Sequence, residues 1–338
     1  MNQIEISWVS LWRVLLIVIF AVALYFLKDV LLILFLALVI SSALDSPISF
    51  LEQKRIPRIL GTLLVFISVL SVLALILYTI VPLAVLESKN IFGVLNKLEV
   101  PDLGPFGSSQ FIENWTSGME KFAETMLSGG ASFIGVISSI FGGIAFVIAA
   151  FVLSFYLALH KDGVENFLKA ILPIKSEDYA VNVYLRSRQK LGLWLKGQLI
   201  LSAIVGVVVF LGLLILGVKY SLILGILAAI LEMVPFVGPV FTGIIAFLLA
   251  VSESWTLGIS VIIFFFIVQQ MENHLLIPAV MRKTVGIHPV VAVISMLAGA
   301  QLAGFVGIIL AVPTAVVIQE VIESRAARKN QVGRFNFE

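Results

Sequence analysis

Long apolar runs separated by short polar stretches dominate the sequence. Eight runs approach or exceed the roughly 20 residues that an α-helix needs to cross the hydrocarbon core of a bilayer. Hydrophobic residues make up 60% of the 338 residues and charged residues only 12%, which is too few charges to cover a soluble surface. The sequence therefore predicts an all-α, polytopic transmembrane protein. The eight segments lie at about 11–27, 30–44, 60–86, 132–159, 198–217, 220–251, 255–271 and 287–322.

Two of the eight segments, 220–251 and 287–322, are interrupted by residues that do not continue a helix. Each half of the first is about 12 residues, or about 18 Å, and cannot cross a core of about 30 Å alone. Irregular backbone at that depth is tolerated only where protein covers it or where it lines a wet cavity. Paired interrupted segments are therefore typical of a transporter binding site. The predicted helix-break or gate residues are Pro235, Gly238, Pro239, Gly299, Gly304 and Gly307.

The interrupted segments can be kinked spanning helices or re-entrant hairpins. Both arrangements keep the basic C-terminal tail on the cytoplasmic side of the membrane. Only the hairpins place Arg282 and Lys283 on the cytoplasmic side, where positive residues are enriched. The charge distribution therefore favours hairpins whose tips meet near the middle of the bilayer and form a gate.

Basic residues gather at 54–58, at 160–196 and in the C-terminal tail. If the helices alternate in direction, all three places and both termini are cytoplasmic, and the acidic stretch 87–130 lies outside. The expected organisation is three transmembrane helices in 1–86, an extracytoplasmic region at 87–130, a fourth helix in 131–159, a cytoplasmic basic helical region at 160–197, the transport core at 198–322 and a cytoplasmic tail at 323–338.

Glu232 is the strongest candidate for chemistry, because it lies deep in the first interrupted segment. Placing an acid there costs about 2.5–3.5 kcal/mol on insertion scales, so such acids mark ion or substrate paths. The structural alternative is a carboxylate that only caps the broken helix. Amides at apolar positions could bind hydroxyl groups or only hold helices together. The candidate binding residues are Glu232, Gln270, Glu272, Asn273 and Gln301.

Several function classes are excluded or disfavoured. The chain has no cysteine and three histidines, without an HExxH pair, so no metal site or other cofactor is expected. No phosphate-binding GxxxxGK[ST] motif occurs, which disfavours an ATP-driven pump. The net charge of +2 does not indicate a nucleic-acid partner. No nucleophile–base arrangement is recognisable, so an enzyme or a non-transporting scaffold is the least favoured class.

Several motifs follow one another in the second half of the chain. They are Glu-Met-Val-Pro-Phe-Val-Gly-Pro at 232–239, Gln-Met-Glu-Asn-His-Leu-Leu-Ile-Pro at 270–278, Val-Gly-Ile-His-Pro at 285–289, and the glycines of 299–307. With these motifs in this order, the chain resembles the autoinducer-2 exporter family over nearly its whole length. The resemblance implies a multi-pass transporter of the cell membrane that forms homo-oligomers such as pentamers.

Two functions remain open at this point. The first is a secondary transporter that exports a small polar metabolite such as autoinducer-2, bound by the candidate acids and amides. The alternative is a monovalent cation (sodium or lithium)/proton antiporter that uses the same acids. The resemblance covers both activities, and the motifs do not separate them.

Overall fold

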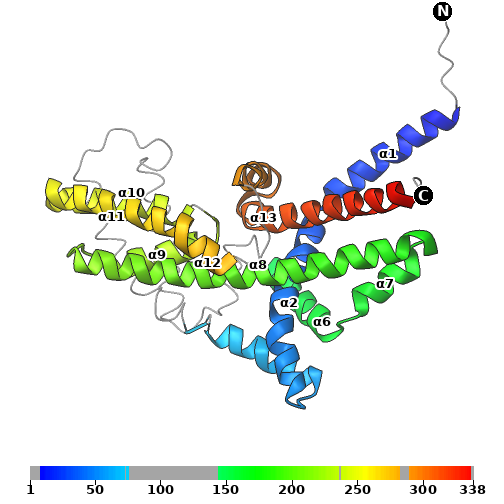
Figure 1. Cartoon of the computed structure of the whole chain (residues 1–338), viewed down its shortest axis with the longest axis horizontal. Helices are drawn as coiled ribbons and strands as arrows, with labels where there is room; N and C mark the ends of the chain where they lie inside the picture. Colours follow the sequence, from blue (N-terminus) through cyan, green and yellow to red (C-terminus); the bar gives the residue numbers. More distant parts are fainter. Residues whose placement is uncertain (1–7, 73, 76–143, 236, 282–288, 336–338) are drawn as a thin grey trace, which may run out of the picture.

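The computed structural model describes residues 8–72, 74–75, 144–235, 237–281 and 289–335. Within them all regular secondary structure is helical (Figure 1), which confirms the all-α class. Four described helices are long and apolar enough to cross a membrane, and several shorter apolar helices accompany them. The predicted acidic region at 87–130 lies outside the described residues. The four long helices are Lys28–Gln53, Ser176–Ile215, Trp255–Val280 and Val306–Arg328.

The first two helices, α1 (Trp8–Phe26) and α2 (Lys28–Gln53), follow one another without a connecting loop. Helical hydrogen bonds continue across Leu27, whose amide donates to the Ala23 carbonyl over 2.9 Å. The apolar segment predicted at 30–44 is shorter than the helix that contains it. The helix continues through Pro47 to Gln53, because a proline removes only one helix hydrogen bond and the neighbouring turns pack against other helices.

The reversal comes after α2, where Arg55 adopts a left-handed backbone conformation with φ 67°. The helix Arg58–Val72 then leaves this turn. After the undescribed stretch, α6 (Ile144–Leu159) and the short α7 (Gly163–Ile171) lead to α8 (Ile174–Ile215).

The central element is α8, which has 42 residues and is about 63 Å long. It joins the predicted basic region to the first helix of the transport core without a break. Figure 1 shows the other helices arranged along it, with α9, α10 and α11 at its C-terminal end. The C-terminal part of α13 and α2 pack nearer its N-terminal end, around Leu191 and Trp194. The molecule thus has two packed groups of helices on one long axis.

The first interrupted segment is a helical hairpin. Its arms are α9 (Ser221–Leu231) and α10 (Val237–Glu253). The Lys219 ammonium lies 2.9 Å from the Glu253 carboxylate, so the chain leaves the segment at the level where it entered. This ion pair also raises the pKa of Lys219, first by its hydrogen bond and then by its charge. A single kinked helix through 220–251 would place these residues at opposite ends, so the hairpin is confirmed here.

The next helix, α11 (Trp255–Met271), starts at the open end of that hairpin. The Ser254 hydroxyl caps it by accepting a hydrogen bond from the Leu257 amide over 3.2 Å. A π-helical turn, η2 (Glu272–Leu276), and α12 (Ile277–Met281) continue it. Arg282 and Lys283, whose sidedness we predicted, lie outside the described residues.

The second interrupted segment belongs to α13 (Pro289–Phe335), which turns sharply at Ala303 and Gly304. Figure 1 shows the orange first half end-on, while the red second half lies in the plane. The turn falls inside the predicted range 299–307. Gly299 and Gly307 meet backbone to backbone across it, because a Cβ on either would overlap the carbonyl group of the other.

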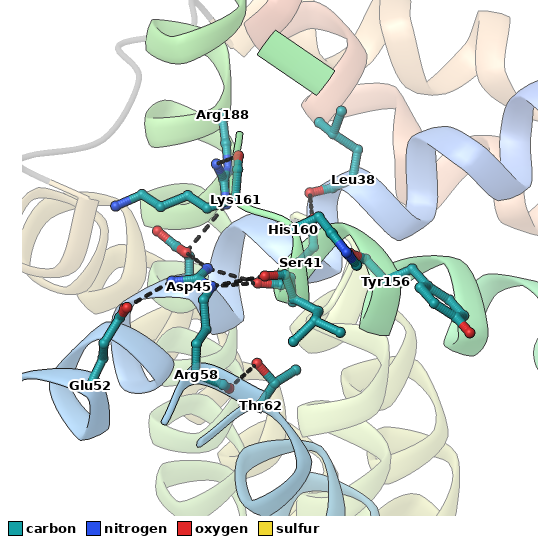
Figure 2. Close-up of polar contacts among 12 residues, drawn as sticks. Leu38, Ser41, Asp45, Glu52, Arg58, Thr62, Tyr156, His160, Lys161 and Arg188 are labelled. Atoms are coloured by element: carbon teal, nitrogen blue, oxygen red, sulfur yellow. Dashed lines mark hydrogen bonds and ion pairs between the residues drawn. The ribbon is translucent and has the colours of Figure 1, made fainter. Parts of the chain in front are cut away.

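Ionic contacts bring the three basic regions together around the N-terminal half of α8. Arg58 and Arg188 both pair with Asp45, over 2.8 and 3.2 Å (Figure 2). Lys190 pairs with the buried Glu320 of α13 over 2.5 Å. The loop at 54–58, the basic region and the start of the tail therefore share one end of the molecule, which we name the basic end.

Candidate functional site

Five buried polar side chains line the contacts of α8, the α9–α10 hairpin and the end of α11. The carboxyl groups of Glu232 and Glu272 are the most unusual, since the two residues are 0% and 1% exposed. Buried carboxylates of this kind are rare in apolar surroundings. We name the set the buried polar cluster, and it consists of Gln198, Ser202, Glu232, Thr242 and Glu272.

The helix break positions Glu232. α9 ends at Leu231, and Glu232 still donates its amide to the Ala228 carbonyl over 2.9 Å. The Gln198 side chain of α8 donates a hydrogen bond to the Glu232 carbonyl. The broken helix end is thus satisfied by an amide from a helix 34 residues earlier in the chain.

The Glu232 carboxyl group itself receives no hydrogen bond from the described residues. It therefore does not cap the broken helix, which was the structural alternative to a functional acid. It lies against the backbone of Gly238, where a Cβ would come within 2.6 Å of its Oε2. The glycine predicted as a break residue thus makes room for the carboxyl group.

Glu272 lies close enough to Glu232 for the two carboxyl groups to influence each other electrostatically. It opens the π-helical turn η2, a feature often found at functional sites. One of its oxygens accepts a long hydrogen bond of 3.5 Å from Gln269, and the other receives none within the described residues. Two carboxyl groups can bond to each other only when they hold a proton between them. With both ionised, the pair would need a cation or a donor from a solute.

The hydroxyl groups of Ser202 and Thr242 also lack partners among the described residues. Ser202 follows Gln198 by one turn on the same face of α8. Thr242 follows Gly238 by one turn on α10. Both residues are at most 5% exposed. The cluster thus combines acceptors and hydroxyls whose hydrogen-bonding capacity is unused, which suits a polar ligand.

Three predicted binding residues do not join the cluster. Gln270, Asn273 and Gln301 are exposed at the surface of the chain. Gln270 lies two residues before Glu272 and Asn273 lies one residue after it. Both side chains therefore point from other faces of the helix. Gln301 precedes the corner of α13, whose buried part packs near Leu191 rather than near Glu232.

Gln198, Ser202 and Thr242 were missed by the sequence analysis. The available signal was their spacing, because Gln198 and Ser202 lie four residues apart in an apolar run. Thr242 likewise lies four residues after the break residue Gly238. No group of three His, Asp or Glu side chains that could hold a metal ion occurs within the described residues.

Comparisons with known proteins agree with this architecture. A family model described as "AI-2E family transporter" matches residues 14–326. The chain is 28% identical to the Bacillus subtilis protein YrrI over 94% of this chain and 89% of YrrI, which is named as a transport protein. It is 27% identical to the transport protein YueF of the same organism over 81% of this chain and 78% of YueF. It is 25% identical to the permease PerM of Escherichia coli K12 over 89% of this chain and 88% of PerM. The chain therefore belongs to the AI-2E transporter family, the family of permease-like membrane transporters that its motifs indicated.

Proposed function

We propose that this protein is a secondary transporter that exports a small polar metabolite such as autoinducer-2 across the cell membrane. The observation that carries the proposal is the pair Glu232 and Glu272, two buried carboxyl groups that face each other at the tip of a helical hairpin. A dry site with unused acceptors and hydroxyls binds a polyhydroxylated solute by replacing its water hydrogen bonds.

The pair also provides a means of coupling transport to protons. One proton held between the carboxyl groups satisfies them when the site is empty, and hydroxyl groups of the solute donate to them when it is occupied. Solute and proton then compete for the same oxygens, which is the requirement for exchange of one against the other.

The sidedness that fits this function places the basic end in the cytoplasm. Both termini are then cytoplasmic. The open end of the α9–α10 hairpin, marked by the Lys219–Glu253 ion pair, faces outside. The solute reaches the hairpin tip from the cytoplasm and leaves on the side of the open end.

The test is transport by the purified protein in proteoliposomes loaded with autoinducer-2. Glu232→Gln keeps the shape of the side chain and removes its charge and its proton exchange. We expect this variant to reduce transport to the rate of liposomes that contain no protein, while the variant itself stays folded and inserted. Glu253→Gln, an acid at the open end of the same hairpin, is the matched control and should keep the wild-type rate. Wild-type transport by a stably purified Glu232→Gln variant would end the proposal.

The second candidate is a monovalent cation/proton antiporter. The specific observation in its favour is that several carboxyl and hydroxyl oxygens of the cluster have no hydrogen-bond partner among the described residues, and such oxygens are the ligands of hard cations. The names of the relatives reported above mention no cation. The same proteoliposomes, without autoinducer-2, distinguish the two functions. Proton movement driven by a sodium or lithium gradient would favour the antiporter over the exporter.

A further inference from the structure

An open pocket of about 550 Å³ lies between α2 and α8 at the basic end. It is separate from the buried polar cluster. Lys196 lines the pocket, whereas Gln198 reaches Glu232. Side chains two positions apart on a helix point about 200° away from each other, so the body of α8 separates the pocket from the buried polar cluster. The helices cross closely at Gly192, where a Cβ would lie 2.5 Å from the Ser42 carbonyl oxygen, and this crossing is part of the pocket wall.

Two polar stripes face each other across the pocket. On α2 the stripe repeats at helical spacing, so its members share one face. On α8 the lining residues repeat with the same period. A polar stripe on a membrane helix is costly unless it meets a polar partner. The stripe of α2 consists of Ser42, Ser46, Ser49 and Gln53, and the polar lining of α8 consists of Arg188, Gln189 and Lys196.

The pocket carries an excess of positive charge. Its lining contains three cations, Lys161, Arg188 and Lys196, but one acid, Asp45. Figure 2 shows Asp45 between Arg58 on one side and Arg188 with Lys161 on the other. Arg58 and Arg188 both pair with Asp45. Within the described residues neither Lys161 nor Lys196 forms an ion pair, so two ammonium groups are left for an anion.

We propose that this pocket binds the phosphate group of a hydroxyl-bearing molecule. Ammonium and guanidinium groups form charge-assisted hydrogen bonds with phosphate oxygens. The serine hydroxyls and glutamine amides of the two stripes match the hydroxyl groups of the rest of the ligand. A soluble polyol phosphate and the glycerol phosphate headgroup of an anionic lipid share this chemistry.

The site is tested by binding to the full-length protein in zwitterionic nanodiscs. The soluble probe is glycerol 3-phosphate, with glycerol as the neutral control, and the heat of binding is measured. The lipid probe is phosphatidylglycerol mixed into the same nanodiscs, and native mass spectrometry counts the lipids retained. The variant Lys161→Gln with Lys196→Gln removes both unpaired charges. The matched control, Lys169→Gln with Arg325→Gln, also removes two positive charges, from exposed residues that do not line the pocket.

We expect the double lysine variant to weaken binding of one of the two probes by about tenfold or more, because it removes both ammonium groups that can bind the phosphate. The control variant and Glu232→Gln should bind as the wild type does. Loss of glycerol 3-phosphate binding identifies a soluble ligand, and loss of phosphatidylglycerol alone identifies a lipid. If both probes bind the double lysine variant as well as the control, or if glycerol binds as well as its phosphate, the proposal is overturned.

Discussion

At the scale of single residues, Gly238 and Glu232 define each other's position. The carboxyl group occupies the space that a side chain at position 238 would need, since a Cβ there would lie 2.6 Å from Glu232 Oε2 and 2.8 Å from the Ala228 carbonyl oxygen. Neither the carboxyl group nor the helix backbone can move without disturbing the hairpin tip. The glycine is therefore required by close approach and not only as a helix breaker.

This close approach predicts that Gly238→Ala displaces the carboxyl group. We expect a loss of about 1–3 kcal/mol in the free energy of unfolding, as for other overpacked sites. We expect transport to fall about tenfold or more, because displacements of about 1 Å in a reacting site have effects of that size. Thermal unfolding in detergent and proteoliposome transport measure the two effects. Gly163→Ala is the control, since its Cβ would meet only the His160 Cβ at 3.4 Å; equal behaviour of both variants would contradict the argument.

How far sequence reasoning reaches is clear from the cluster itself. Glu232 and Glu272 could be predicted, because an acid in an apolar run is visible without a structure. Gln198 was not predicted, because its role depends on a contact with the carbonyl of a residue 34 positions later. Gln270, Asn273 and Gln301 were selected for their polarity alone, and polarity does not say which face of a helix is buried.

At the scale of elements, the α9–α10 hairpin is the feature that a sequence pattern alone left open. Pro235, Gly238 and Pro239 predicted the break, but a break permits either a kink or a reversal. The Lys219–Glu253 ion pair shows the reversal. α10 begins at Val237, so Pro239 lies in its first turn, where the missing amide donor is not needed.

The hairpin predicts which introduced cysteines can be linked. The chain has no native cysteine, so Lys219→Cys with Glu253→Cys gives the only two thiols. We expect a short bifunctional thiol reagent to link them in native membranes. Lys219→Cys with Met233→Cys is the control, because the 11 residues of α9 separate the open end from the tip by about 16 Å. Linkage of the control pair but not of the first pair would show that α9 and α10 are not arranged as a hairpin.

The corner of α13 depends on Gly304, whose φ of 57° and ψ of −136° form a backbone conformation that essentially only glycine adopts. A Cβ there would meet nothing within 4 Å, so the backbone alone resists a side chain. We expect Gly304→Ala to lower the free energy of unfolding by about 1–3 kcal/mol, measured as a lower melting temperature in detergent. Gly61→Ala is the control, because Gly61 is helical and its Cβ would contact Leu51 at an ordinary 3.5 Å. A fully stable Gly304→Ala variant would mean that the corner is not needed.

Helix boundaries were less predictable than helix existence. Residues 45–47 contain an acid, a serine and a proline, a composition typical of a turn, yet α2 passes through them. The structure explains this by packing: Ser42, Ala43 and Ile48 are buried on both sides of the proline. Tertiary contacts of this kind override local preference, and a single sequence does not contain them.

At the scale of the whole molecule, α8 connects two groups of helices with different chemistry. The C-terminal half holds the hairpin, α11 and the buried carboxyl pair, inside an apolar core that includes Val205 and Phe265. The N-terminal half holds ion pairs, with Lys190 bound to Glu320 and Glu323 of α13. α8 therefore contributes to both groups, because its Gln198 contacts Glu232 and its Lys190 pairs with Glu320.

This arrangement, combined with the positive-inside rule, predicts an orientation in the membrane. The chain passes from the basic end along α8 to Lys219, enters the hairpin, leaves it at Glu253 and returns along α11. The positive-inside rule predicts a cytoplasmic basic end, and with that orientation we expect Glu253 to face outside. Lys169, on α7 at the basic end, is then expected inside, where the sequence analysis also predicts Lys283.

Single cysteines test this orientation in intact cells with a membrane-impermeant thiol reagent. Each of Glu253→Cys, Lys169→Cys and Lys283→Cys would be the one thiol in its protein, because the chain has no cysteine. We expect labelling at position 253 and none at positions 169 and 283 until the cells are permeabilised, which serves as the control for reactivity. Labelling at 283 but not at 253 or 169 would mean that the segment 220–251 crosses the membrane. Labelling at 169 and 283 but not at 253 would mean that the molecule is inverted. In the first case the carboxyl pair could not lie at the tip of a re-entrant hairpin, and the proposed exchange of proton and solute at that tip would have to be given up.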